Sequence, residues 1–232
     1  RANTGGSLET ALESVTTNQR NNKGALLVKS SGNDFNSGSS SSTYCGSSGA
    51  YPELACTEAI IDTTHQFPYT VVTAAIRADD TKSSYSTPGP SIWISGYGGE
   101  YGYNSNYVSV GSGIYDPAIM TTDQSGCTNG YVGANSAYQV NEFNNNSGGY
   151  SENADCNYVS TFNGTSSAAP SVSGVIALML EANPDLTWRD VKHIIASTAD
   201  KIDENNEFTL AGITQYEWET NAAGFDFHNW YG

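Results

Sequence analysis

Three short apolar runs, each bounded by turn residues, restrict most strongly what this chain can fold into. They are ALLVKS at 25–30, YTVVTAAI at 69–76 and SIWISG at 91–96. Apolar runs of this length between Gly, Pro, Ser and Asn residues are typical of buried strands. Helical patterns lie before them at 7–20 and after them at 188–199 and beyond Ser166. Strands that alternate with helices predict an α/β fold, with helices covering a mainly parallel sheet.

The remaining segments are predicted as follows. Residues 7–20 place four apolar side chains on one helical face, at Leu8, Ala11, Leu12 and Val15. Loops are predicted over 34–55 and 97–161, apart from a short apolar piece at 117–122. The tail that ends at Gly232 is polar and aromatic.

Composition excludes several classes of function. The chain has 232 residues, of which 38% are hydrophobic, so it can bury a substantial core as one large domain or two small ones. Its formal net charge of −15 repels nucleic acid and anionic membranes and attracts cationic ligands. Its apolar runs are shorter than the roughly 18 residues that a membrane span requires.

Four cysteines indicate the compartment. None lies in a C-x-x-C pair, so the pattern does not favour zinc, and all lie in Gly-, Ser- and Asn-rich sequence, which is typical of extracellular disulfides. Proximity in the sequence favours the pairs Cys45–Cys56 and Cys127–Cys156, one of three pairings that four cysteines allow. Reduced cysteines in a cytosolic protein are the alternative. The sequence predicts a secreted or extracytoplasmic protein, and a chain that is already processed or cut from a longer one.

The stretch FNGTSSAAP at 162–170 allows two interpretations of Ser166. A hydroxyl in the first turn of a helix lies near free backbone N–H groups at the positive end of the helix dipole, where an oxyanion is stabilised. Ser and Thr are also ordinary helix caps, and Gly and Pro are common at helix starts. The residues alone therefore leave a nucleophile and a cap open.

The longer phrase decides between them by resemblance. NGTSSAAP resembles the G-T-S-x-x-A-P segment that carries the nucleophile of subtilisin-like serine proteases. ALMLEANPDLTWRDVKHII is similar to the L-x-L-E-A-N-x-x-L-T-W-R-D pattern of the kexin and furin branch, and weaker similarity extends over 1–232. The resemblance implies a three-layer α/β fold with a mainly parallel central sheet, and a serine endopeptidase whose nucleophile is Ser166.

Two further segments acquire roles from the same resemblance. VKSSGNDF resembles the segment that holds the oxyanion asparagine, which implies that role for Asn33 and places Ser30 and Gly32 in the substrate-binding site; a turn is the alternative for Asn33. DTTHQFPYT resembles D-G-Y-T-N-S-x-Y-T, which implies that Asp62 lies at the floor of a pocket for a basic substrate residue. A surface turn or cap is the alternative for Asp62.

Calcium is where the family pattern fails. The resemblance implies structural calcium, but the two acidic ligand positions near the pocket are Thr57 and Thr87 here. Calcium prefers carboxylate oxygens, so this site is expected to be absent or altered, with Glu58 as a substitute only if the register shifts. The family's other calcium ligands lie mostly in sequence outside this chain, and no catalytic metal is implied.

The general base is the other missing part. None of His65, His193 and His228 lies in the H-G-T phrase that carries the base in this family, and all three are expected to be structural. We therefore expect residues 1–232 to be the C-terminal portion of a subtilisin-like catalytic domain, without its catalytic Asp and His.

Two classes of function remain open. One is a peptidase that acts on polypeptides with basic residues together with the rest of its catalytic domain. The other is a catalytically incomplete fragment or relative that serves as a binding or structural module. A following β-sandwich domain and a partner chaperone are further candidate partners.

Overall fold

A three-stranded parallel sheet forms the centre of the chain. The computed structural model describes residues 6–37, 44–46, 49–104, 117–134, 139–145 and 150–232. The strands β1 (Leu27–Ser30), β2 (Thr70–Ile76) and β3 (Ile92–Tyr97) lie in the order β1-β2-β3, and both neighbouring pairs are parallel. These are the three apolar runs of the sequence, so the predicted parallel sheet is confirmed. β2 is buried over its whole length, as expected for a central strand.

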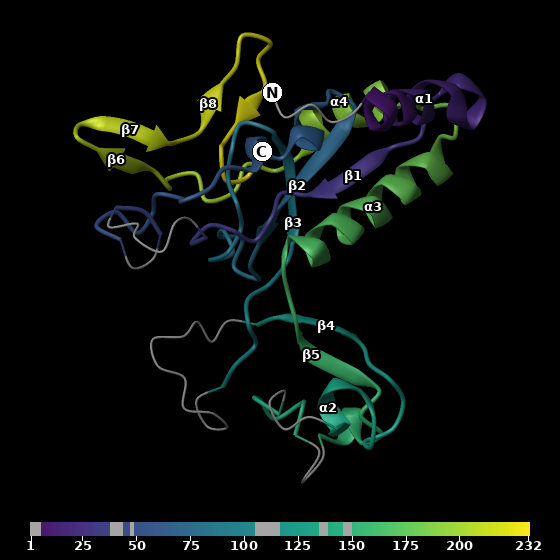
Figure 1. The fold of residues 1–232 in the computed structure, drawn as a ribbon, viewed down its shortest axis with the longest axis vertical. Coiled ribbons are helices and arrows are strands. Elements are labelled where there is room, and N and C mark those ends of the chain that lie inside the picture. The colour runs from purple at the N-terminus through teal and green to yellow at the C-terminus, as the bar shows by residue number, and fades with distance from the viewer. Residues whose placement is uncertain (1–5, 38–43, 47–48, 105–116, 135–138, 146–149) are drawn as a thin grey trace.

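The helix α3 (Thr165–Ala182) crosses all three strands on one face of the sheet (Figure 1). Val172 and Ile176 of α3 pack against Val71 of β2, and Val191 of α4 (Trp188–Thr198) joins the same core. The opposite side of α3 is exposed although its sequence is apolar: Val175 is 58% and Leu178 65% exposed. The helix after Ser166 is therefore buried on the sheet side only.

The tail of the chain packs against Ile76 at the end of β2 and against β3, where the Ser95 hydroxyl donates to the carbonyl of Tyr231. The hairpin β6 (Phe208–Leu210) and β7 (Ile213–Tyr216) packs with Trp230, Tyr231 and Ile76 in an aromatic core. A second small pair, β8 (Glu219–Thr220) and β9 (Asp226–Phe227), precedes the C-terminus. The tail thus has strands that its polar and aromatic pattern did not predict, because these strands are too short to show a period.

The N-terminal helix α1 (Gly6–Asn22) ends in an irregular turn near the sheet. Arg20 and Asn21 have left-handed backbone angles, and Gly24 follows with φ of +80°. A Cβ on Gly24 would lie 1.9 Å from the carbonyl oxygen of Thr16, so only glycine fits there. The Arg20 guanidinium donates to the carbonyl groups of Gly24 and Leu186, which ties the end of α1 to the segment before α4.

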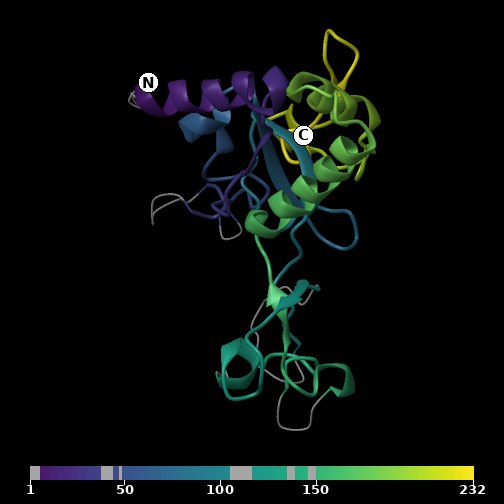
Figure 2. The same cartoon turned by 90° about the vertical axis from the view of Figure 1, so that its right-hand side faces the viewer.

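The described residues between β3 and α3 extend away from the sheet, as both views show (Figure 1, Figure 2). It holds the antiparallel strands β4 (Ile119–Thr122) and β5 (Tyr158–Phe162), the short helix α2 (Gly130–Ala134) and the turn η4 (Ser151–Asn153). β4 coincides with the predicted apolar piece. We refer to the described residues between β4 and β5 as the extended limb. The described helices include none that is long and apolar enough to cross a membrane.

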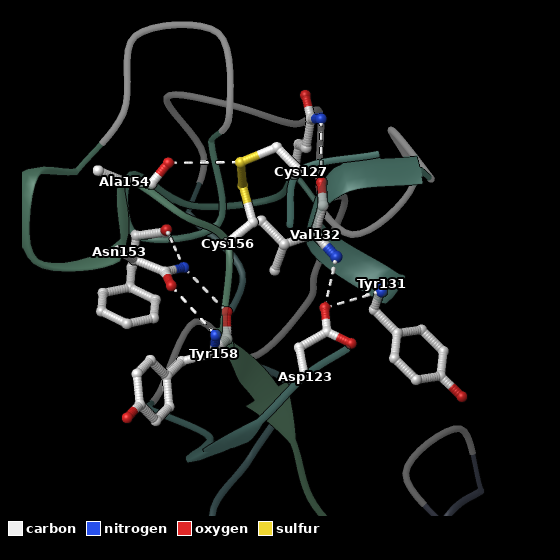
Figure 3. The surroundings of a disulfide bond; sticks show 10 residues. Asp123, Cys127, Tyr131, Val132, Asn153, Ala154, Cys156 and Tyr158 are labelled. Atoms are coloured by element: carbon white, nitrogen blue, oxygen red, sulfur yellow. Dashed lines mark hydrogen bonds between the residues drawn. A yellow bond between two sulfur atoms is a disulfide. The ribbon is translucent and has the colours of Figure 1, made fainter. Parts of the chain in front are cut away.

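Two disulfides stabilise loops of the chain. Cys45 pairs with Cys56, and Cys127 pairs with Cys156 in the extended limb, which are the pairings predicted from proximity. Figure 3 shows the Cys127–Cys156 disulfide and the side chains near it that form hydrogen bonds with the backbone. The Asp123 carboxylate accepts the backbone N–H groups of Tyr131 and Val132, and the Asn153 side chain exchanges two hydrogen bonds with the backbone of Tyr158. Hydrogen bonds to the backbone and a covalent link hold this limb, which has only a small apolar cluster.

The difference in burial between the two sides of α3 can be tested by its effect on the free energy of unfolding. Ile176→Ala opens a cavity in the core and is expected to lower the free energy of unfolding by about 2–5 kcal/mol. Val175→Ala, one residue earlier on the exposed side, is the matched control and should change it by less than about 0.5 kcal/mol. Urea denaturation followed by tryptophan fluorescence measures both. Equal losses would contradict the packing of α3 on the sheet.

Candidate active site

Loops from the carboxyl ends of all three sheet strands meet the N-terminus of α3. Residues 31–33 follow β1, Ser83 and Tyr85 follow β2, and Gly98 follows β3. In parallel sheets, ligands bind at this edge because the carboxyl ends of the strands and the N-termini of helices lie together there. The candidate site therefore lies at the carboxyl edge of the sheet, where α/β proteins commonly have their active sites.

Tyr85 fixes the residue that precedes the helix. Its buried hydroxyl accepts the backbone N–H of Gly164 at 2.8 Å and lies 2.8 and 2.6 Å from the carbonyl oxygens of Gly98 and Gly99. Burial raises the pKa of Tyr85 to about 12, so the hydroxyl stays protonated and can donate to a carbonyl. One side chain thus links the end of β3 to the start of α3.

Asn33 is held by the threonine that precedes Ser166. Its side-chain oxygen accepts from both the backbone N–H and the hydroxyl of Thr165, each at 2.9 Å. The Thr165 hydroxyl also accepts the N–H of Gly32 at 3.2 Å. A Cβ on Gly164 would lie 3.2 Å from the Asn33 amide nitrogen, so this nitrogen lies beside the backbone that leads into the nucleophile turn. These bonds define which end of the Asn33 amide is the oxygen.

Ser166 is the second residue of α3 and is exposed, whereas Thr165 and Ser167 on either side of it are buried. Gly164 precedes the helix with φ of +109°, a conformation that favours glycine and lets the chain turn sharply into α3. N–H groups in the first turn of a helix have no intrahelical acceptors. In α3 the N–H of Thr165 donates to Asn33, and that of Ser167 donates to the Gly164 carbonyl. The exposed Ser166 therefore offers its hydroxyl and its own N–H together at the start of the helix.

The three histidines have other contacts in the described part of the chain. His65 lies beside Lys29 and the Ala59 carbonyl, the His193 ring meets Phe225 edge-on, and the buried His228 accepts the N–H of Trp230. Burial lowers the pKa of His228 to about 4, so this ring is neutral at pH 7. Among the described residues, no histidine forms a hydrogen bond with Ser166.

Asp62 is paired with a lysine of the same chain. The Lys29 ammonium donates to Oδ2 of Asp62, and the Thr64 backbone N–H and hydroxyl donate to Oδ1. Partial burial raises the pKa of Asp62, but the hydrogen bonds from Lys29 and Thr64 outweigh it and bring the pKa well below its usual range. The carboxylate is exposed over 43% of its side chain. Asp62 is therefore ionised and within reach of solvent.

The two threonines at the positions expected to have lost their calcium ligands form hydrogen bonds with neighbouring loops. The Thr57 hydroxyl donates to the carbonyl of Ser37, and the buried Thr87 hydroxyl accepts the N–H of Asp34. Thr87 also donates its N–H to the carbonyl of Gly32, so it supports the loop that carries Asn33. The described residues contain no group of three or more His, Cys, Asp or Glu side chains that could hold a metal ion.

Comparison with known proteins identifies the family of the chain. A family model described as the subtilase family matches residues 2–216. The chain belongs to that family. An extracellular serine protease of Aeromonas sobria is 33% identical over 221 residues, which cover 90% of this chain and 33% of the relative. Kexin of Saccharomyces cerevisiae is 31% identical over 169 residues, which cover 72% of this chain and 20% of kexin.

A solved structure extends the likeness to the fold. The crystal structure of the serine protease of Aeromonas sobria matches with a TM-score of 0.76 and 31% identity, over 100% of this chain and 38% of that chain. The same protease has also been solved in complex with a chaperone. The subtilase chain thus spans about a third of the length of the Aeromonas sobria protease and a fifth of kexin. It has the α/β fold of subtilisin-like serine proteases.

Tyr85, Thr165 and Lys29 contact the predicted site residues or the turn before Ser166, and sequence reasoning missed all three. Thr165 lies inside the matched G-T-S phrase, so the phrase itself was the available signal for it. Nothing in the sequence pairs Lys29 with Asp62, because the two are 33 residues apart and meet only through the sheet. Ser30 is the last residue of β1, and Gly32 immediately precedes Asn33. The resemblance implied substrate contacts for both Ser30 and Gly32.

Proposed function

We propose that this subtilase chain is the C-terminal portion of the catalytic domain of a secreted serine endopeptidase, and that it carries the nucleophile and the oxyanion donor. The observation that carries the proposal is the attachment of the Asn33 side-chain oxygen to Thr165. It directs the NH₂ end of the amide away from Thr165 and beside the turn that presents Ser166. In this orientation the amide NH₂ can donate to a carbonyl oxygen held at Ser166.

In the proposed reaction, Ser166 attacks the carbonyl carbon of a peptide bond. The carbonyl oxygen of that peptide bond becomes negatively charged in the tetrahedral intermediate. The Asn33 NH₂ and the Ser166 backbone N–H donate hydrogen bonds to this oxygen. Because Thr165 and Tyr85 hold these groups before substrate arrives, little reorganisation is needed when the charge develops. Removal of one such donor typically lowers the rate by about 10²–10³.

The Asp and His that complete the reaction are proposed to lie in protein sequence outside this chain. The relatives that the chain matches are about three times its length, which leaves room for them. Polypeptides are the proposed substrates, and a chaperone is a proposed partner, since the Aeromonas sobria protease forms such a complex. The two disulfides and the extracellular relative support secretion. Any structural calcium is proposed to use ligands outside this chain.

A change at Thr165 tests the oxyanion arrangement. Thr165→Val removes the hydroxyl that holds Asn33 and is expected to lower kcat of the full-length protein roughly tenfold, less than loss of the donor itself. Thr165→Ser keeps the hydroxyl and is the matched control, which should retain most of the activity. Steady-state kinetics on a peptide substrate measures both variants. Equal activity of the Val and Ser variants would remove Thr165 from the arrangement.

Ser166→Ala tests the function itself. Peptide hydrolysis by the full-length protein should fall by about 10⁴ or more, because the covalent step is lost while binding remains. The isolated 232-residue chain should show no serine-dependent hydrolysis, since its proposed base is elsewhere. Covalent labelling of Ser166 by a fluorophosphonate provides a second readout. A full-length protein that neither hydrolyses peptides nor reacts with the probe would favour the non-catalytic alternative.

We further propose that the enzyme cleaves after Arg or Lys, with Asp62 as the pocket carboxylate. Asp62→Asn should lower kcat/KM for a peptide with Arg before the cleaved bond about tenfold more than for its Leu analogue, because a charged side chain then loses its partner. The ionised and accessible state of Asp62 supports this role. Paired substrates that differ only at this residue provide the measurement. Equal effects on both substrates would exclude Asp62 from the pocket.

A further inference from the structure

Lys29 forms an ion pair with Asp62, the carboxylate that is proposed to bind the basic side chain of the substrate. It lies in β1 and directs its ammonium group to the loop before β2, where it donates to Oδ2 of Asp62 and lies 3.0 Å from Nε2 of His65. The side chains of Lys29 and Asp62 are 39% and 43% exposed. The pair is therefore formed within the chain but remains open to a solute that carries a positive charge.

The acceptors around Lys29 are fixed by their own hydrogen bonds. Nδ1 of His65 lies 2.7 Å from the carbonyl oxygen of Ala59, so Nδ1 carries the proton and Nε2 is left as an acceptor for the ammonium. Oδ1 of Asp62 already accepts two hydrogen bonds from Thr64. Oδ2 is thus the atom of Asp62 that remains for a cation, and Lys29 takes it.

Lys29 is also close to the reacting groups along the chain. It precedes Asn33 by four residues, and an extended chain of that length spans at most about 14 Å. The strand β1 that carries Lys29 leads directly into Ser30 and Gly32. A change of charge at Lys29 therefore acts within the substrate-binding region and not on a remote surface.

We propose that Lys29 competes with the basic side chain of a substrate for Asp62, and so determines how strongly the enzyme selects Arg or Lys. This inference rests on the peptidase function and on the pocket role proposed for Asp62. A tethered ammonium is always near its partner, so it has a high effective concentration relative to a diffusing substrate. It also repels a second cation at the same carboxylate. The substrate class is thus peptides with a basic residue, selected only moderately over neutral ones.

The experiment removes the competing charge in the full-length protein. Lys29→Met should raise the ratio of kcat/KM for an Arg peptide to that for its Leu analogue on the order of fivefold, the scale of a half-exposed ion pair. Lys29→Gln is a second neutral variant in case the first does not fold, and Lys29→Arg restores the charge and should restore the low ratio. Lys23→Met, which breaks the exposed Lys23–Asp185 pair, is the matched control and should leave the ratio unchanged.

A double-mutant cycle distinguishes the inference from the function on which it rests. In an Asp62→Asn background, Lys29→Met should raise the ratio clearly less than in the unchanged protein, because it relieves charge repulsion but releases no carboxylate. If Asp62→Asn lowers the ratio but neither neutral variant at Lys29 raises it, Lys29 is only structural and the peptidase proposal stands. If neither position affects the ratio while cleavage still needs Ser166, the basic pocket and the Lys29 inference both fail. Inhibition by benzamidine, which should strengthen in Lys29→Met, gives an independent binding readout.

Discussion

The close approach of α3 to the sheet is the constraint on which the rest of the structure depends. A Cβ on Gly96 of β3 would lie 2.8 Å from the carbonyl oxygen of Ala168 in α3, and a Cβ on Gly98 would lie 2.5 Å from the Cβ of Ala75. Only hydrogen atoms at these two positions let the first turn of the helix reach β2 and β3. This approach brings Gly164 within reach of Tyr85 and Thr165 within reach of Asn33.

The site follows from this packing more than from any single residue. Ser166 is exposed and its neighbours Thr165 and Ser167 are buried, so of the three hydroxyl residues at the start of α3 only Ser166 faces solvent. The residues that follow β1 provide the hydrogen-bond partners of the buried Thr165, namely the Asn33 side chain and the Gly32 N–H. The Lys29–Asp62 pair joins β1 to the loop before β2, and Ser166 begins the helix that packs on the same sheet.

The sequence predicted those parts of the fold whose signals are local. β2 and β3 are continuous apolar runs, α4 begins with a capping box between Thr187 and Asp190, and each disulfide joins cysteines close in sequence. β6 to β9 escaped prediction because two to four residues cannot show a period, and their aromatic side chains pack across long separations. The G-T-S phrase indicated Ser166, but Lys29 is invisible as a site residue until the sheet brings it to Asp62.

The apolar outer side of α3 has a consequence for how the isolated chain behaves in solution. Val175 and Leu178 expose apolar surface on consecutive turns, and such patches promote association between copies of a protein. The net charge of −15 opposes that association by mutual repulsion, which salt screens over a distance of about 10 Å at 0.1 M. Colloidal stability of the chain is therefore set by ionic strength: dilute buffer keeps copies apart, and concentrated salt brings their helices together.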